Sequence, residues 1–215
     1  CALPIWLGND PENYRWTFLK ENHVARDNFA PMVALAQALD LTGPALDRET
    51  RRLMDVDEWL RAVAFINLLG GGDIYSMGNS HNLIIYIRPS DGRAMAFPWD
   101  MDYSFVNATT QAFPGTGSPN TTKLITTIPA NYRAFLAHLY DLTAVTGNAA
   151  YLADWNTRYA GLLGENWSGA VDFLVQRAAY VRGQLPTATP FAISNNGGDN
   201  FTMAGSQVVL SGTAP

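Results

Sequence analysis

Two aspartates separated by a single residue, Asp100 and Asp102, are the side chains of this chain best suited to chemistry. They follow a short apolar run, Ala94 to Pro98, and so come where a strand would leave the core. Because side chains at i and i+2 of an extended segment share a face, both carboxylates should point the same way. Two such charges repel each other unless a cation lies between them, and hard divalent cations prefer oxygen ligands. The pair therefore suggests a metal site.

A solvated loop is the alternative, since aspartate pairs of this spacing are common at strand ends. The neighbours of the pair are large and apolar: Phe97, Trp99, Met101, Tyr103 and Phe105. They favour a position at the edge of a core, where an unpaired charge is costly.

Asp73 and Asn82 are the other candidates. Asp73 follows three glycines, which allow a sharp turn, and Asn82 begins the first apolar run and can offer a carbonyl oxygen to a cation. The order Asp, Asn, hairpin, Asp is that of the protein kinase catalytic segment, where one Asp orients the hydroxyl nucleophile and the Asn and later Asp hold magnesium. The alternatives are that Asp73 caps a turn and that Asn82 satisfies a strand end.

These residues need a hairpin and a buried helix to position them. Asn82 to Arg88 and Ala94 to Pro98 flank the turn signal Pro89-Ser90-Asp91-Gly92, which predicts a β-hairpin. Before it, Trp59 to Leu69 is apolar almost all round and follows a capping Asp55, which predicts a central, buried helix.

The rest of the first 186 residues is mostly helical in pattern. Further helices are expected at Phe29–Asp40, Ala45–Met54, Asn131–Val145, Ala149–Leu163 and Trp167–Leu185, and a mobile surface loop at Asn107–Asn120. After Pro186 the pattern changes to short strands, Phe191–Ser194, Phe201–Met203 and Gln207–Leu210. We expect a mainly α fold with a small β-hairpin over residues 1–186, followed at 187–215 by the first strands of a β-rich, sandwich-like module.

Composition excludes several classes of function. The 215 residues carry a net charge of −5 and show no basic patch, which argues against a nucleic-acid partner. No apolar run approaches the ~20 residues that span a bilayer. Cys1 is the only cysteine, so neither an internal disulfide nor a cysteine-rich zinc site can form.

Several segments resemble the CotH (spore coat protein H) kinase family. Met54 to Leu60 is similar to the start of the family's central helix, and His81 to Tyr86 to its "hNyylY" strand. Ala96 to Phe105, which contains Pro98-Trp99-Asp100-Met101-Asp102, matches the "iPWDlDwtfg" signature. Asn131 to Arg133, and a last long helix that carries Arg177 and Arg182, lie where the family has its closing helices.

The resemblance implies an atypical bacterial protein kinase, secreted or attached to the cell surface, that transfers phosphate from ATP to Ser or Thr of a protein substrate. It implies Asp73 as the catalytic aspartate, Asn82, Asp100 and Asp102 as ligands of Mg (or Mn), and Trp99 and Asp100 near the nucleotide. Trp99 would pack beneath the site or serve as a core anchor. The chain would be the helical, kinase-like C-lobe, and the parent would add an N-terminal lobe and downstream β modules.

Two departures from the family pattern leave a second hypothesis open. The usual Asn-Trp-Asp is here Gly71-Gly72-Asp73, and no Gly-rich phosphate-covering strands or ATP-pairing Lys precede Asp47, Lys20 being the only early lysine. The fragment by itself would then be inactive. The alternative is a non-catalytic, kinase-like structural module of a bacterial surface or envelope protein; metal-dependent hydrolysis is a weaker third reading.

Overall fold

The computed structural model describes residues 5–77, 81–115, 118–186, 192–203, 205 and 207–213. The chain divides into two compact units, Cys1–Gly183 and Gln184–Pro215. It is about 54% helical with a small two-stranded antiparallel sheet, which confirms the mainly α fold with a hairpin. The helices are α1 (Pro11–Arg15), α2 (Ala30–Asp40), α3 (Gly43–Leu53), α4 (Val56–Leu69), α5 (Pro119–Thr126), α6 (Pro129–Asp141), α7 (Ala149–Leu163) and α8 (Ser168–Gln184).

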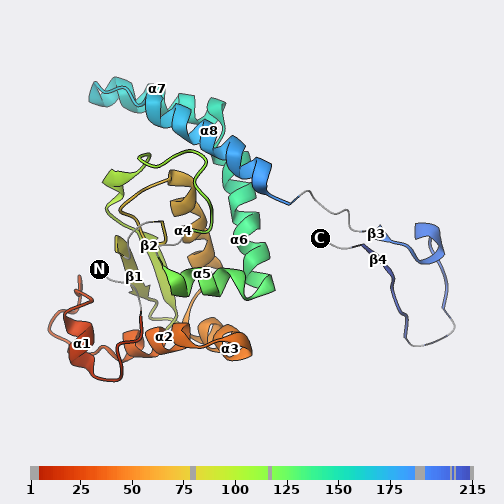
Figure 1. The fold of residues 1–215 in the computed structure, drawn as a ribbon, viewed down its shortest axis with the longest axis horizontal. Coiled ribbons are helices and arrows are strands. Elements are labelled where there is room, and N and C mark those ends of the chain that lie inside the picture. The colour runs from red at the N-terminus through yellow and green to blue at the C-terminus, as the bar shows by residue number, and fades with distance from the viewer. Residues whose placement is uncertain are drawn as a thin grey trace. The chain divides into compact units, whose positions relative to one another are not determined.

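Helix α4 is the centre of the first unit, as its apolar sequence predicts. It packs against β2 on one side and α6 on the other (Figure 1). Asp55 caps its start by accepting the Glu58 N–H at 3.4 Å, and Gly70 ends it in the left-handed conformation, with φ 60°. Trp59, Val63 and Ile66 are fully buried, so α4 is a fixed support for the loop that follows it.

The predicted hairpin is present as β1 (Leu83–Ile87) and β2 (Ala94–Pro98). The strands are antiparallel, with Leu83 opposite Pro98 and Ile87 opposite Ala94. Ala94 and Ala96 are buried, and their strand packs against α4. Their small side chains let β2 approach the helix closely. Ile85 of β1 packs against a separate cluster of apolar side chains from the N-terminal region, Tyr14, Phe18, Phe29 and Ala36.

In the segment expected to be a mobile loop, Asn107–Asn120, the described residues 107–115 and 118–120 are instead tied to the core. The Gly115 N–H donates to the side chain of Asn67 at 2.8 Å, and α5 begins within the segment at Pro119. Ser118 caps α5 by accepting the Thr121 N–H. Two features explain the composition that suggested a loop. Pro119 and the Thr residues after it form the capped start of α5, and Gly115 lets the backbone approach Asn67 closely.

In the second unit, β3 (Ala192–Ile193) pairs with β4 (Gly212–Thr213). The strands predicted at Phe201–Met203 and Gln207–Leu210 are wrong for the residues described there, which are irregular, and Phe191 lies outside the described residues. The apolar side chains there are exposed, so they lack the packing that stabilises strands. In the described part of the chain, no helix combines the length and apolarity needed to cross a bilayer.

Candidate functional site

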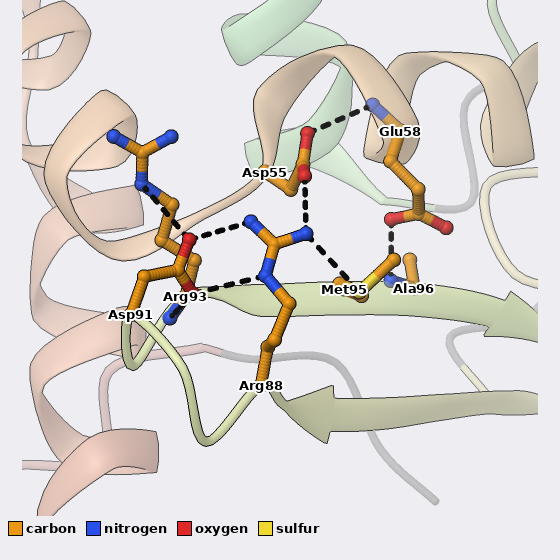
Figure 2. A network of polar contacts seen from close by, with 7 residues as sticks. All are labelled: Asp55, Glu58, Arg88, Asp91, Arg93, Met95 and Ala96. Atoms are coloured by element: carbon orange, nitrogen blue, oxygen red, sulfur yellow. Dashed lines mark hydrogen bonds and ion pairs between the residues drawn. The ribbon is translucent and has the colours of Figure 1, made fainter.

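The hairpin is fastened to the N-terminus of α4 by a polar network around Arg88 (Figure 2). The Arg88 guanidinium donates to Asp55 at 2.9 Å and to both carboxylate oxygens of Asp91, at 2.6 and 3.0 Å. The Ala96 N–H of β2 donates to Glu58 of α4 at 2.9 Å. Helix and hairpin are thus held together beside the hairpin's turn and along β2, so the opposite end of the hairpin has a defined position.

Two acids of this network, Asp91 and Glu58, have pKa values that are shifted in opposite directions. The hydrogen bonds from Arg88, aided by that from the Arg93 N–H, lower the pKa of Asp91 to about 2. Burial instead raises the pKa of Glu58, against the opposing effect of the hydrogen bond from Ala96.

Asp73 lies on the loop that leaves α4 through Gly70 and Gly71. A Cβ at Gly71 would collide with Ile74 and lie 3.1 Å from the Tyr103 carbonyl oxygen, so this loop needs glycine there. The Asp73 carbonyl accepts a hydrogen bond from Asn82 Nδ2 at 2.7 Å. The side chain of Asp73 is 33% exposed, and its Oδ1 lies 2.8 Å from His81 Nε2. Asp73 is therefore both accessible and held in one orientation.

Asn82 stands immediately before β1 and has φ 61°, a conformation that asparagine tolerates better than most residues. Its side-chain NH₂ group faces the Asp73 carbonyl, an orientation assigned from that hydrogen bond. Within the described residues, its Oδ1 accepts no hydrogen bond.

Asp100 and Asp102 do not lie on an extended segment, so the expectation that they share a strand face is wrong. Strand β2 ends at Pro98, Asp100 has φ 52° and ψ 62°, and the 3-10 helix η1 (Met101–Tyr103) follows. Both aspartates are exposed, so they do not occupy the edge of a core either. Aspartate adopts the left-handed conformation more readily than most residues, which permits this sharp turn after the strand.

Trp99 is not a core anchor, because 57% of its surface is exposed. Its N–H donates to the Asn82 carbonyl at 3.2 Å, one pair beyond the β1–β2 ladder. The indole therefore lies at the same end of the hairpin as Asn82, and it is largely exposed.

Backbone hydrogen bonds bring the candidate residues to one junction. The Trp99–Asn82 bond places Asp100 next to Asn82. The Gly72 N–H donates to the Tyr103 carbonyl at 3.2 Å, which places the segment with Asp102 beside the Asp73 loop. Further bonds along the same two segments join Phe105 N to Leu69 O and Asn107 N to Gly70 O. The backbone segments that carry the four polar residues singled out in the sequence thus lie side by side at one end of the hairpin.

The candidate metal ligands at this junction, Asn82, Asp100 and Asp102, all offer oxygen atoms, which hard cations prefer. They are an amide oxygen and two carboxylates, and among the described residues neither the Asp100 nor the Asp102 carboxylate forms a hydrogen bond or an ion pair. However, no group of three or more His, Cys, Asp or Glu side chains among the described residues could hold a metal by itself. Further oxygens would have to come from water or from a ligand.

Sequence reasoning missed the contact of His81 with Asp73. Its ring nitrogen reaches the carboxylate because the residue precedes Asn82, whose side chain already contacts Asp73. Its position next to Asn82 in the sequence was the available signal.

Comparison with protein families identifies a match that covers the candidate site. The model of the family described as CotH kinase protein matches residues 3–150, which include the central helix, the Asp73 loop, the hairpin and η1. No curated protein matches the chain. The match spans well over half of the 215 residues and contains the whole junction, so this chain belongs to the CotH kinase family.

Proposed function

We propose that this chain is the catalytic, helical lobe of a protein kinase that transfers the γ-phosphate of ATP to a Ser or Thr hydroxyl of a protein substrate, with Mg (or Mn). Family membership supports kinase-like chemistry in general. The observation that carries the specific proposal is the junction, where Asp73, Asn82 and the Asp100–Asp102 pair meet through backbone hydrogen bonds. In protein kinases an Asp that orients the hydroxyl, with an Asn and a later Asp that hold magnesium, forms the C-lobe part of the phosphoryl-transfer site.

In the proposed reaction, Asp73 orients the substrate hydroxyl and accepts its proton. The hydroxyl oxygen forms a bond to the γ-phosphorus, the bond from that phosphorus to the β–γ bridging oxygen breaks, and ADP leaves. Asp73 is suited to this role because its carboxylate is exposed to an incoming hydroxyl while its backbone is held by Asn82. His81 holds one carboxylate oxygen, Oδ1.

Asn82, Asp100 and Asp102 would hold the metal ion, which when bound neutralises charge on the phosphates. We propose that Asp100 and Trp99 contact the nucleotide. The exposed Trp99 offers an indole surface beside Asn82, at the place where a nucleotide would lie.

We further propose that an N-terminal lobe in the natural protein completes the nucleotide site, because a kinase needs one to hold the β- and γ-phosphates. In this proposal the fragment alone is inactive, the protein acts outside the cell or at the surface of a bacterium, and residues 187–215 begin a β-rich module.

Binding of Mg-ATP to the full-length protein tests the site. We expect Mg-ATP to raise the melting temperature of the wild type. It should also raise that of the control variant Asp154→Asn, which removes an exposed carboxylate on α7. The shift should be lost in Asp100→Asn. A shift of equal size in all three proteins would contradict the assignment of Asp100.

The second candidate is a non-catalytic structural module. It is favoured by the contact that already occupies Asp73 Oδ1 and by Gly71, where the family has asparagine and this loop has no room for a side chain. A full-length protein whose stability does not respond to Mg-ATP would support this function instead.

A further inference from the structure

Arg177 of α8 is fully buried, which is rare for an arginine. Its guanidinium donates to the Asn67 carbonyl through Nε, at 3.3 Å, and through Nη2, at 3.1 Å. Through Nη1 it donates to the carbonyls of Thr109, at 2.9 Å, and Gln111. One side chain thus joins the last turns of α4 to the segment that follows the Asp100–Asp102 turn.

The partners of Arg177 are carbonyl dipoles and aromatic rings. Among the described residues, no carboxylate forms an ion pair with it, and the rings of Phe113 and Tyr180 lie 5.9 and 5.5 Å from its guanidinium carbon. Burial consequently lowers its pKa. The Asn67 carbonyl belongs to the C-terminal end of α4, where the helix dipole favours a positive charge. A buried charge is retained at such a place only if its hydrogen bonds are made.

The side chain of Asn67 links the Arg177 contact to two loops, the Asp73 loop and the segment that ends at Gly115. Its side chain is fully buried, accepts the Gly115 N–H at 2.8 Å and lies 3.4 Å from Ser76 Oγ, three residues after Asp73. Its NH₂ group also donates to the Val63 carbonyl at 2.8 Å, which fixes the rotamer. The Arg177–Asn67 pair therefore connects α8, α4, the Asp73 loop and the segment from Thr109 to Gly115.

We propose that Arg177 is a positioning residue for phosphoryl transfer, which clamps the end of α4 to the Thr109–Gly115 segment and so fixes the Asp73 loop in its working position. The effect of Arg177 on phosphoryl transfer rests on the proposed function, whereas its structural role does not. Arg177 lies beyond residues 3–150, so the C-terminal helices supply part of the active-site support from outside the matched region.

Hydrogen exchange in this chain tests the clamp directly. We compare Arg177→Met and Arg177→Lys with the control Arg182→Met, which removes another α8 arginine that donates to a backbone carbonyl, that of Thr143. Because a hydrogen bond to a charged group is lost, the Gly115 amide and the 67–77 segment should exchange about tenfold faster or more in Arg177→Met. Arg177→Lys should be intermediate, and Arg182→Met should match the wild type in these segments.

Equal protection of both segments in Arg177→Met and Arg182→Met would overturn the proposal. Unfolding of both Arg177 variants would also overturn it, because Arg177 would then serve the fold as a whole rather than two loops.

Activity of the full-length protein tests the catalytic meaning separately. Arg177→Met should lower kcat by about tenfold or more with little change in KM for ATP, and Arg177→Lys should restore part of it. Loss through KM alone would contradict a role in positioning Asp73. If the wild type transfers no phosphate, the proposed function fails, whereas the exchange data still decide the clamp.

Discussion

The turn that delivers Asp73 depends on Gly70, and replacing this residue by alanine should destabilise the protein strongly. Gly70 has φ 60°, and a Cβ there would lie 2.5 Å from Cζ of Phe173. If the half-buried Phe173 moved away, it would disturb its edge-on packing against Phe105, whose ring centroid lies 5.6 Å from its own. Both the backbone and the packing therefore oppose a side chain at this position.

The two penalties can be estimated separately. A non-glycine residue in the left-handed conformation costs about 1–2 kcal/mol. Overpacking by one methyl group against a neighbouring ring costs about 1–3 kcal/mol. A total near 3 kcal/mol corresponds to a fall of roughly 6–12 °C in melting temperature for a protein of this size.

Gly161 provides the matched control. It lies inside α7, and a Cβ there would have no neighbour within 4 Å. Gly161→Ala should therefore stabilise the protein by about 0.5–1 kcal/mol, because alanine favours a helix over glycine. Thermal unfolding of the two variants beside the wild type is the assay. A melting temperature for Gly70→Ala at or above that of the wild type would refute the structural reasoning for this turn.

Three further changes test the supports of the site by thermal unfolding. Asn67→Ala should cost about 1–3 kcal/mol because it leaves the buried Gly115 N–H without its acceptor, and unchanged stability would contradict the contact. Asp91→Asn should reduce stability above pH 4, because a lowered pKa means that the charged form stabilises the folded state. The difference should shrink as pH falls from 4 toward the folded-state pKa of about 2, and a difference at pH 2 as large as that at pH 7 would contradict the pairing with Arg88. The raised pKa of Glu58 means that the folded state favours its protonated form, so the wild type should lose stability as pH rises from 4 to 7 and Glu58 ionises. Glu58→Gln cannot ionise, so its stability relative to the wild type should increase over this range. The opposite trend would show that the folded state favours the charged form.

Local sequence signals predicted the supports of the site. The cap at Asp55, the apolar run of α4 and the turn before Gly92 each lie within a few residues of the structure they determine. Such signals carry their own physical cause, so α4 and the hairpin were predictable without knowledge of the rest of the fold.

The geometry of the site itself was less predictable. Asp100 and Asp102 were expected in an extended strand, but the chain turns after Pro98, and alternation of residue types cannot reveal a positive φ at an aspartate. The link from Arg177 to Asn67 joins residues 110 positions apart, which no local pattern encodes. One signal was present: Asn67 is a polar residue in an otherwise apolar stretch of α4, and a buried polar group requires partners.

The most direct test of the central claim separates nucleotide affinity from phosphate transfer in Asp73→Asn. In the full-length protein with Mg-ATP and a protein substrate, we predict a nucleotide Kd within about threefold of the wild type, because Asp73 acts on the hydroxyl and not on ATP. Transfer should fall by about 10²-fold or more, the usual contribution of a positioned base. Transfer at the wild-type rate by Asp73→Asn would contradict the account.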